Sequence, residues 1–146
     1  MARETSLWTW LSRASKVLRD ALHMHRVENL VMKGMPDVEG FLLDAGQFWL
    51  ELKSSERPAR SETPVRFKVR GREAQARWLN RRWNMGGAAW LLLQVGSGPE
   101  RRVYLVPGCH AQEVYVGVNE ERLAELDVLR EPRVRPETVV RRAATR

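Results

Sequence analysis

The stretch that decides the fold is GMPDVEGFLLDAGQFWLELKSS, residues 34–55. Two apolar runs, residues 38–43 and 48–53, flank the turn sequence Asp44-Ala45-Gly46-Gln47, and this arrangement predicts a β-hairpin. Three charged residues interrupt the otherwise apolar hairpin: Asp37, Glu51 and Lys53. Because a buried charge is costly unless it is paired or binds a metal, the hairpin is a candidate functional site.

The closure of the hairpin decides which face these charges share. A three-residue loop Asp44-Ala45-Gly46 with a left-handed glycine pairs Asp37 with Lys53 and gathers all three charges at the open end. The opposite face is then apolar, made of Val38, Leu42, Phe48, Leu50 and Leu52. A two-residue loop would place Asp37 on the other face, unless the bend at Pro36 turned it back, so the clustering is a hypothesis.

Two carboxylates and one ammonium at this spacing suit phosphodiester hydrolysis. Carboxylates hold a hard divalent cation such as Mg²⁺, and a lysine positions the attacking water or stabilises developing charge. The alternative is that Pro36-Asp37 is an ordinary turn dipeptide and that Glu51 and Lys53 form a weak exposed ion pair.

The rest of the chain supplies elements in an order typical of a mixed sheet. Helical spacing predicts helices over residues 6–22, 72–85 and 120–129. Further strands are predicted over 23–31, 88–95, 102–106 and, as a short element, 114–118. The order helix, three strands, helix, strand predicts an α/β or α+β fold with a mixed central sheet. We expect one domain over residues 1–130, with its core in about 1–95 and additions in 96–130, then a basic, flexible tail over 131–146.

The positive charge is concentrated directly after the hairpin. Residues 57–82 hold nine Lys and Arg residues and two acidic ones, so the whole excess of +7 in this 146-residue chain resides there. A localised basic segment is the electrostatic signature of a polyanion partner, although a solvated charged surface is the simpler explanation. The residues predicted to contact DNA are Arg66, Lys68, Arg70, Arg72, Arg77 and Arg81.

Other features exclude several classes of protein. The single cysteine, Cys109, excludes an internal disulfide framework and fits a reducing cytosol. No apolar run reaches the ~18 residues of a membrane helix, and the N-terminus does not resemble a signal peptide. We therefore expect a cytoplasmic protein without a membrane partner.

Pro36-Asp37 followed by Glu51-Leu52-Lys53 resembles the signature of the PD-(D/E)xK nuclease superfamily. With Gly34-Met35 before it and Gln75 and Trp78-Leu79 after it, the pattern is similar to the VRR-NUC and Holliday-junction-resolvase-like nucleases, particularly small phage-type ones. The resemblance covers about residues 1–95 and implies a restriction-endonuclease-like core.

The resemblance also implies roles for individual residues. Asp37, Glu51 and the backbone carbonyl of Leu52 would bind the metal, and Lys53 would be the catalytic lysine. Gln75 would support the site, although a satisfied core glutamine is about equally consistent with its position. A further acidic ligand is expected to be Glu28, with Glu4 as the second choice.

The predicted function is a Mg²⁺- or Mn²⁺-dependent DNA endonuclease, without an organic cofactor. By analogy with the family it acts on structured or branched DNA and forms a homodimer. The alternatives are a DNA-binding protein that keeps the fold without catalysis, and a structural phage-type protein whose charges merely pair. The sequence leaves open the form of the DNA substrate, the cleavage position, the need for a partner protein and the role of residues 107–118.

Overall fold

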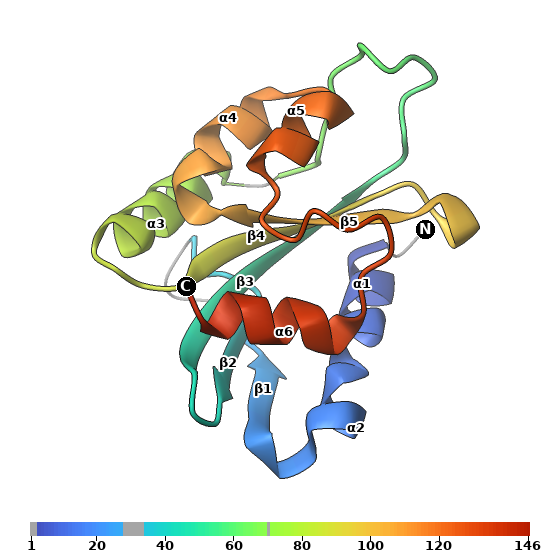
Figure 1. The fold of residues 1–146 in the computed structure, drawn as a ribbon. Helices are drawn as coiled ribbons and strands as arrows, with labels where there is room; N and C mark the ends of the chain where they lie inside the picture. The colour runs from blue at the N-terminus through green and yellow to red at the C-terminus, as the bar shows by residue number, and fades with distance from the viewer. Residues whose placement is uncertain (1–2, 28–33, 70) are drawn as a thin grey trace.

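The computed structural model describes residues 3–27, 34–69 and 71–146, with side chains from Ser6 onward. Its centre is a five-stranded sheet in the order β1-β2-β3-β4-β5 (Figure 1). The strands are β1 (Leu22–Arg26), β2 (Val38–Leu42), β3 (Gly46–Ser55), β4 (Ala89–Val95) and β5 (Arg102–Pro107). The α-helices are α1 (Arg3–Ser12), α2 (Ala14–Leu18), α3 (Arg72–Asn84), α4 (Ala111–Val116), α5 (Glu120–Leu126) and α6 (Pro136–Ala144). Three short 3₁₀ helices complete the set: η1 (Arg19–Ala21), η2 (Gly98–Glu100) and η3 (Gly108–His110).

The sheet is mixed, as the sequence predicts. Strands β1, β2 and β3 are antiparallel, β4 runs parallel to β3, and β5 is antiparallel to β4. Helix α3 provides the crossover that a parallel pair requires. The order helix, three strands, helix, strand is therefore confirmed. In the described part of the chain, no helix is long and apolar enough to cross a membrane.

Two layers of helices cover the sheet (Figure 1). Helices α1, α2 and α6 pack on one face, against the even-numbered residues of β3 such as Leu50 and Leu52. Helices α3, α4 and α5 pack on the other face, against the odd-numbered residues of β4 such as Leu91 and Leu93. Every residue of β4 is buried, as expected for its continuous apolar sequence.

The β2–β3 hairpin has a different register from the expected one. Leu42 pairs with Gly46 and Val38 with Leu50, so the loop is Leu43-Asp44-Ala45 and the pairing is shifted by two residues. The left-handed residue is Asp44, with φ of 63°, a conformation that aspartate tolerates better than most residues. A shift of two preserves the side-chain face, whereas a shift of one would have reversed it. The predicted apolar face is therefore correct.

Two other expectations are wrong. Residues 114–118 do not form a strand: Ala111, Val114 and Tyr115 are buried at helical i, i+3, i+4 spacing in α4, and only Val118 makes a β-bridge, to Val65. The helix expected over residues 6–22 is divided into α1, α2 and η1, and Arg19 has a positive φ of 49°.

The segment 131–146 is not a flexible tail. It forms α6, which begins at Pro136, a residue suited to the first turn of a helix, and buries Val139, Val140, Ala143 and Ala144 on one face. The Trp90 indole N–H of β4 donates to the Ala143 carbonyl at 3.0 Å. The polar composition concealed this stripe, because four small apolar residues suffice to dock a short helix.

Candidate active site

The three charged residues of the hairpin lie together on the α3 side of the sheet. Glu51 and Lys53 alternate with the apolar residues of β3, and only 1% and 6% of their surfaces are exposed. Lys53 Nζ lies 3.1 Å from Glu51 Oε2. The Leu52 amide donates to Asp37 Oδ2 at 3.0 Å, which fixes Asp37 beside this pair. The clustering is confirmed, although the roles of the residues remain predictions.

Glu51 is held in an electrostatically unfavourable position. Burial, and then the nearby Asp37 carboxylate, raise the pKa of Glu51 to about 8, although Lys53 acts in the opposite direction. Its second oxygen, Oε1, is buried and has no hydrogen-bond partner. A buried acceptor without a partner is costly, and a cation is the ligand that would relieve both the missing contact and the repulsion.

The donor set fits a hard divalent cation with few protein ligands. In residues 3–27, 34–69 and 71–146, no group of three or more His, Cys, Asp or Glu residues could hold a metal. Mg²⁺ requires no such group, since one or two carboxylates with waters and substrate phosphates commonly suffice. Asp37 and Glu51 meet that requirement, and the unpartnered Glu51 Oε1 is the atom to which such an ion would bind.

The remaining predicted ligands are placed less completely. Glu28 lies outside the described residues, and Glu4 belongs to α1 but its side chain is not described. The contact seen for Leu52 is made by its amide rather than by the carbonyl expected to bind a metal. The further ligands therefore remain predictions.

Gln75 lies in α3 beside the turn that carries Asp37. A Cβ atom on Gly34 would lie 2.5 Å from the Ala74 carbonyl oxygen and 3.2 Å from the Gln75 amide nitrogen. Gly34 also has a φ of 89°, so only glycine allows this close approach. The Gln75 Oε1 atom accepts a hydrogen bond of 3.0 Å from the Tyr115 hydroxyl.

Tyr115 was missed by the sequence analysis. It is almost fully buried in α4, and the Arg72 side chain of α3 donates to its carbonyl at 3.1 Å. No local pattern links residue 115 to residue 75, because the contact depends on the packing of α4 against α3. This contact gives residues 107–118 a structural link to the candidate site.

The predicted DNA-binding residues divide into three groups. Arg66 and Arg72 donate to backbone carbonyls of Val116 and Tyr115 near the end of α4, so each has a structural contact. Arg70 lies outside the described residues. The other three, Lys68, Arg77 and Arg81, are exposed, as Arg66 and Arg72 also are. DNA contact by any of the six remains a prediction.

Arg82 is a second residue that the sequence analysis missed. Its guanidinium lies 4.5 Å from the ring centroid of Trp78 and 5.8 Å from that of Trp49. Trp49 is two residues before Glu51 and shares its face of β3. Arg82 follows Gln75 by seven residues, a spacing that places both on one side of α3, so the helical pattern could have identified it.

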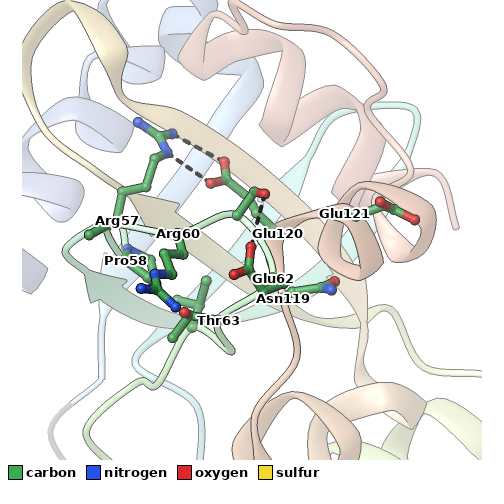
Figure 2. A pocket seen from close by; sticks show the side chains of 11 residues that line it. Arg57, Pro58, Arg60, Glu62, Thr63, Asn119, Glu120 and Glu121 are labelled. Carbon is green, nitrogen blue, oxygen red and sulfur yellow. Dashed lines mark hydrogen bonds and ion pairs between the residues drawn. The ribbon is translucent and has the colours of Figure 1, made fainter.

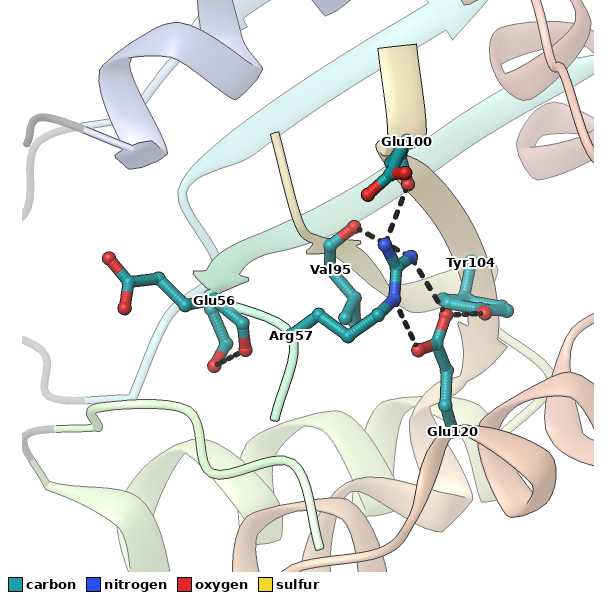
Figure 3. A network of polar contacts seen from close by, with 7 residues as sticks. Glu56, Arg57, Val95, Glu100, Tyr104 and Glu120 are labelled. Atoms are coloured by element: carbon teal, nitrogen blue, oxygen red, sulfur yellow. Dashed lines mark hydrogen bonds and ion pairs between the residues drawn. The ribbon is translucent and has the colours of Figure 1, made fainter. Parts of the chain in front are cut away.

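Arg57, the first arginine of the basic segment, has a structural role. Arg57 Nε donates to Glu120 Oε1 at 2.8 Å, and its Nη2 donates to Glu120 Oε2 at 3.1 Å (Figure 3). Its Nη1 donates to the Glu100 carbonyl, and the Tyr104 hydroxyl donates to Glu120 Oε2. A cavity of about 350 Å³ lies between this anchored loop and the start of α5 (Figure 2). The Arg57–Glu120 ion pair holds the polar loop after β3 against the sheet.

No protein-family model and no curated protein matches the chain. Among solved structures, it is similar to Hjc, a Holliday junction resolvase from the archaeal hyperthermophile Archaeoglobus fulgidus. The two chains are 16% identical, and the match covers 86% of this chain and 98% of that chain with a TM-score of 0.45.

Proposed function

We propose that this protein is a metal-dependent DNA endonuclease with its active site at Asp37, Glu51 and Lys53. The observation that carries the proposal is Glu51, a buried carboxylate that has one oxygen without a partner and lies beside Asp37. A merely structural ion pair would be expected to satisfy both oxygens.

Asp37 and Glu51 would hold Mg²⁺ or Mn²⁺, with the Leu52 carbonyl and Glu28 as the further ligands. When bound, the cation supplies electrophilic stabilisation of the charge that develops on the phosphate. Lys53 Nζ lies 3.1 Å from Glu51 Oε2, and from this position its ammonium can orient water or donate to a phosphoryl oxygen. The Tyr115 hydroxyl donates to the Gln75 amide oxygen and so holds this side chain in place beside the candidate site.

The DNA would run along the basic segment. Lys68, Arg77 and Arg81 are exposed and supply phosphate contacts, together with Arg66, Arg70 and Arg72. We propose branched or otherwise structured DNA as the substrate, a phage-type VRR-NUC-like nuclease as the class, and a homodimer in the cytoplasm of a bacterium or an infected cell as the working form. Two-fold symmetry suits the cutting of two strands.

The test is cleavage of labelled duplex, single-stranded, flap and four-way-junction DNA in Mg²⁺ and in Mn²⁺. Lys53→Ala is the informative variant, and Lys16→Ala, an exposed lysine on α2, is the matched control. We expect cleavage by the wild type and by Lys16→Ala, and loss of cleavage in a folded Lys53→Ala protein. Binding without cleavage in either metal would favour the non-catalytic DNA-binding protein. A protein that neither binds nor cleaves any of these DNAs would exclude both the nuclease and the DNA-binding function.

A further inference from the structure

A second concentration of positive charge lies on the opposite face of the sheet from Glu51. A cavity of about 240 Å³ is bounded by α1, by η2 and the start of β5, and by the segment before α6. Its lining residues are Trp10, Gly98, Pro99, Arg101, Val103, Pro132, Arg133 and Val134. Two of them are arginines and none is acidic. Trp10 and Val103 belong to the core that packs on the α1 side, so this cavity is separate from the candidate active site.

Arg101 lies in this cavity without a counter-charge. Its guanidinium lies 5.3 Å from the ring centroid of Trp10, a cation–π contact. Burial, and then the like charge of Arg13, lower the pKa of Arg101. Within the described residues, Arg101 and Arg133 make no ion pair or side-chain hydrogen bond with any partner.

Two arginines with structural roles, Arg57 and Arg122, are paired differently from Arg101. Arg57 is matched by two oxygens of Glu120, and Arg122 by both oxygens of Glu113. Arg101 instead has the like charge of Arg13 as its electrostatic neighbour, and Arg133 lines the same cavity. Like charges held together in a partly desolvated place are unfavourable unless an anion bridges them.

We propose that the cavity between α1, η2 and the segment before α6 binds a phosphate group through Arg101 and Arg133. The planar guanidinium of arginine matches phosphate oxygens in two-point hydrogen bonds, and the apolar rim of Val103, Val134 and the prolines limits competition from water. The phosphate belongs either to the DNA backbone, at a point remote from the scissile bond, or to a free phosphate-bearing molecule. The proposal does not depend on nuclease activity.

The test is isothermal titration calorimetry of the full chain with pyrophosphate in metal-free buffer. The wild type is compared with the variants Arg101→Gln and Arg133→Gln. Arg141→Gln, an exposed arginine on α6 outside the cavity, is the matched control. We expect each cavity variant to weaken pyrophosphate binding about tenfold, as the loss of a charge-assisted contact implies, and the control to leave it unchanged. Arg133 is exposed, so its replacement tests the cavity even if Arg101→Gln perturbs folding.

A second arm identifies the source of the phosphate. The same variants are measured for binding to labelled duplex and four-way-junction DNA by fluorescence anisotropy in EDTA, so cleavage plays no part. A parallel loss of DNA affinity assigns the cavity to a DNA phosphate. Unchanged DNA affinity with weakened pyrophosphate binding assigns it to a free phosphate-bearing ligand. Equal pyrophosphate affinity in the wild type and both cavity variants would overturn the proposal, whatever the nuclease assay shows.

Discussion

Lys53 and Arg57 lie only four residues apart along the chain, but the ion pairs that they form, Glu51–Lys53 and Arg57–Glu120, are built in opposite ways. Glu51 has one oxygen paired with Lys53 and one buried without a partner, and its pKa is raised to about 8 by burial and by Asp37. Both oxygens of Glu120 are bonded, by Arg57 and by Tyr104. Burial would raise the pKa of Glu120, but these hydrogen bonds outweigh burial and lower it.

The difference separates a structural contact from a candidate active site. The Arg57–Glu120 pair is complete in the folded chain and has nothing left to bind. The Glu51 carboxylate is incomplete, so the folded chain retains an unfavourable group that an added cation would stabilise. Groups of this kind commonly mark functional sites, where stability is given up for activity.

The largest expected effect is that of Glu51→Gln on cleavage. The substitution keeps the size of the side chain but removes a charged metal ligand, so we expect cleavage to fall at least about 100-fold. The free energy of unfolding at pH 6 should change little, because the raised pKa already leaves Glu51 mostly protonated there. Cleavage rates and urea denaturation measure the two quantities. Full activity of this variant would remove Glu51 from the site.

The two centres should also respond to pH with opposite signs. The folded-state pKa of Glu51 is raised, so its contribution to stability is present below pH 4.5 and is lost as the pH rises toward 8. The folded-state pKa of Glu120 is lowered, so its contribution is present above pH 4.5 and is lost on acidification below that.

Urea denaturation from pH 3 to 9 in EDTA tests this difference. Glu51→Gln should abolish the alkaline loss of stability, and Glu120→Gln should reduce the acid loss. Saturating Mg²⁺ should restore stability to the wild type at pH 8, because a bound cation favours the ionised carboxylates. An identical slope between pH 5 and 8 in the wild type and in Glu51→Gln would contradict the raised pKa.

A smaller effect is expected when the structural pair is weakened. Glu120→Gln leaves Arg57 with a neutral acceptor in a partly buried position, and we expect a loss of about 1–2 kcal/mol in the free energy of unfolding. Cleavage under folded conditions should stay within about threefold of the wild type, because no atom of this pair belongs to the candidate site. The exposed neighbour Glu121→Gln is the matched control. A large loss of activity in a stable Glu120→Gln protein would contradict a purely structural role for the Arg57–Glu120 pair.

The sequence predicted the candidate site better than its surroundings, for reasons that are local. The two-residue repeat of a strand places Glu51 and Lys53 on one face in any register, and the observed shift of two keeps Asp37 with them. The register itself was missed because Asp44, and not the expected glycine, takes the left-handed turn position. The order of the core elements followed from apolar patterns of sufficient length.

The elements that failed are short or depend on distant partners. The sequence of α4 has alternating valines, typical of a strand, and its helical burial depends on packing against α3. Helix α6 has a polar composition and a narrow apolar stripe. The hydrogen bond from Tyr115 to Gln75 joins residues forty positions apart, and no local spacing encodes such a contact.

The smallest effect is expected when the hydroxyl group of either buried tyrosine, Tyr115 at the candidate site or Tyr104 at the structural pair, is removed. Tyr115→Phe removes the hydroxyl that donates to Gln75, so we expect kcat to fall by about 3- to 10-fold with KM unchanged. Tyr104→Phe removes the donor to Glu120, so it should lower stability and leave kcat unchanged. Each tyrosine thus serves as the control for the other.

A double-mutant cycle separates positioning from simple packing. If Tyr115 acts through Gln75, then Tyr115→Phe should have little further effect on kcat in a Gln75→Ala background. Additive losses would instead mean that the hydroxyl stabilises α4 independently of the site. Because Tyr115 lies forty residues after Gln75, non-additivity would show that α4 contributes to the candidate site through this one hydrogen bond.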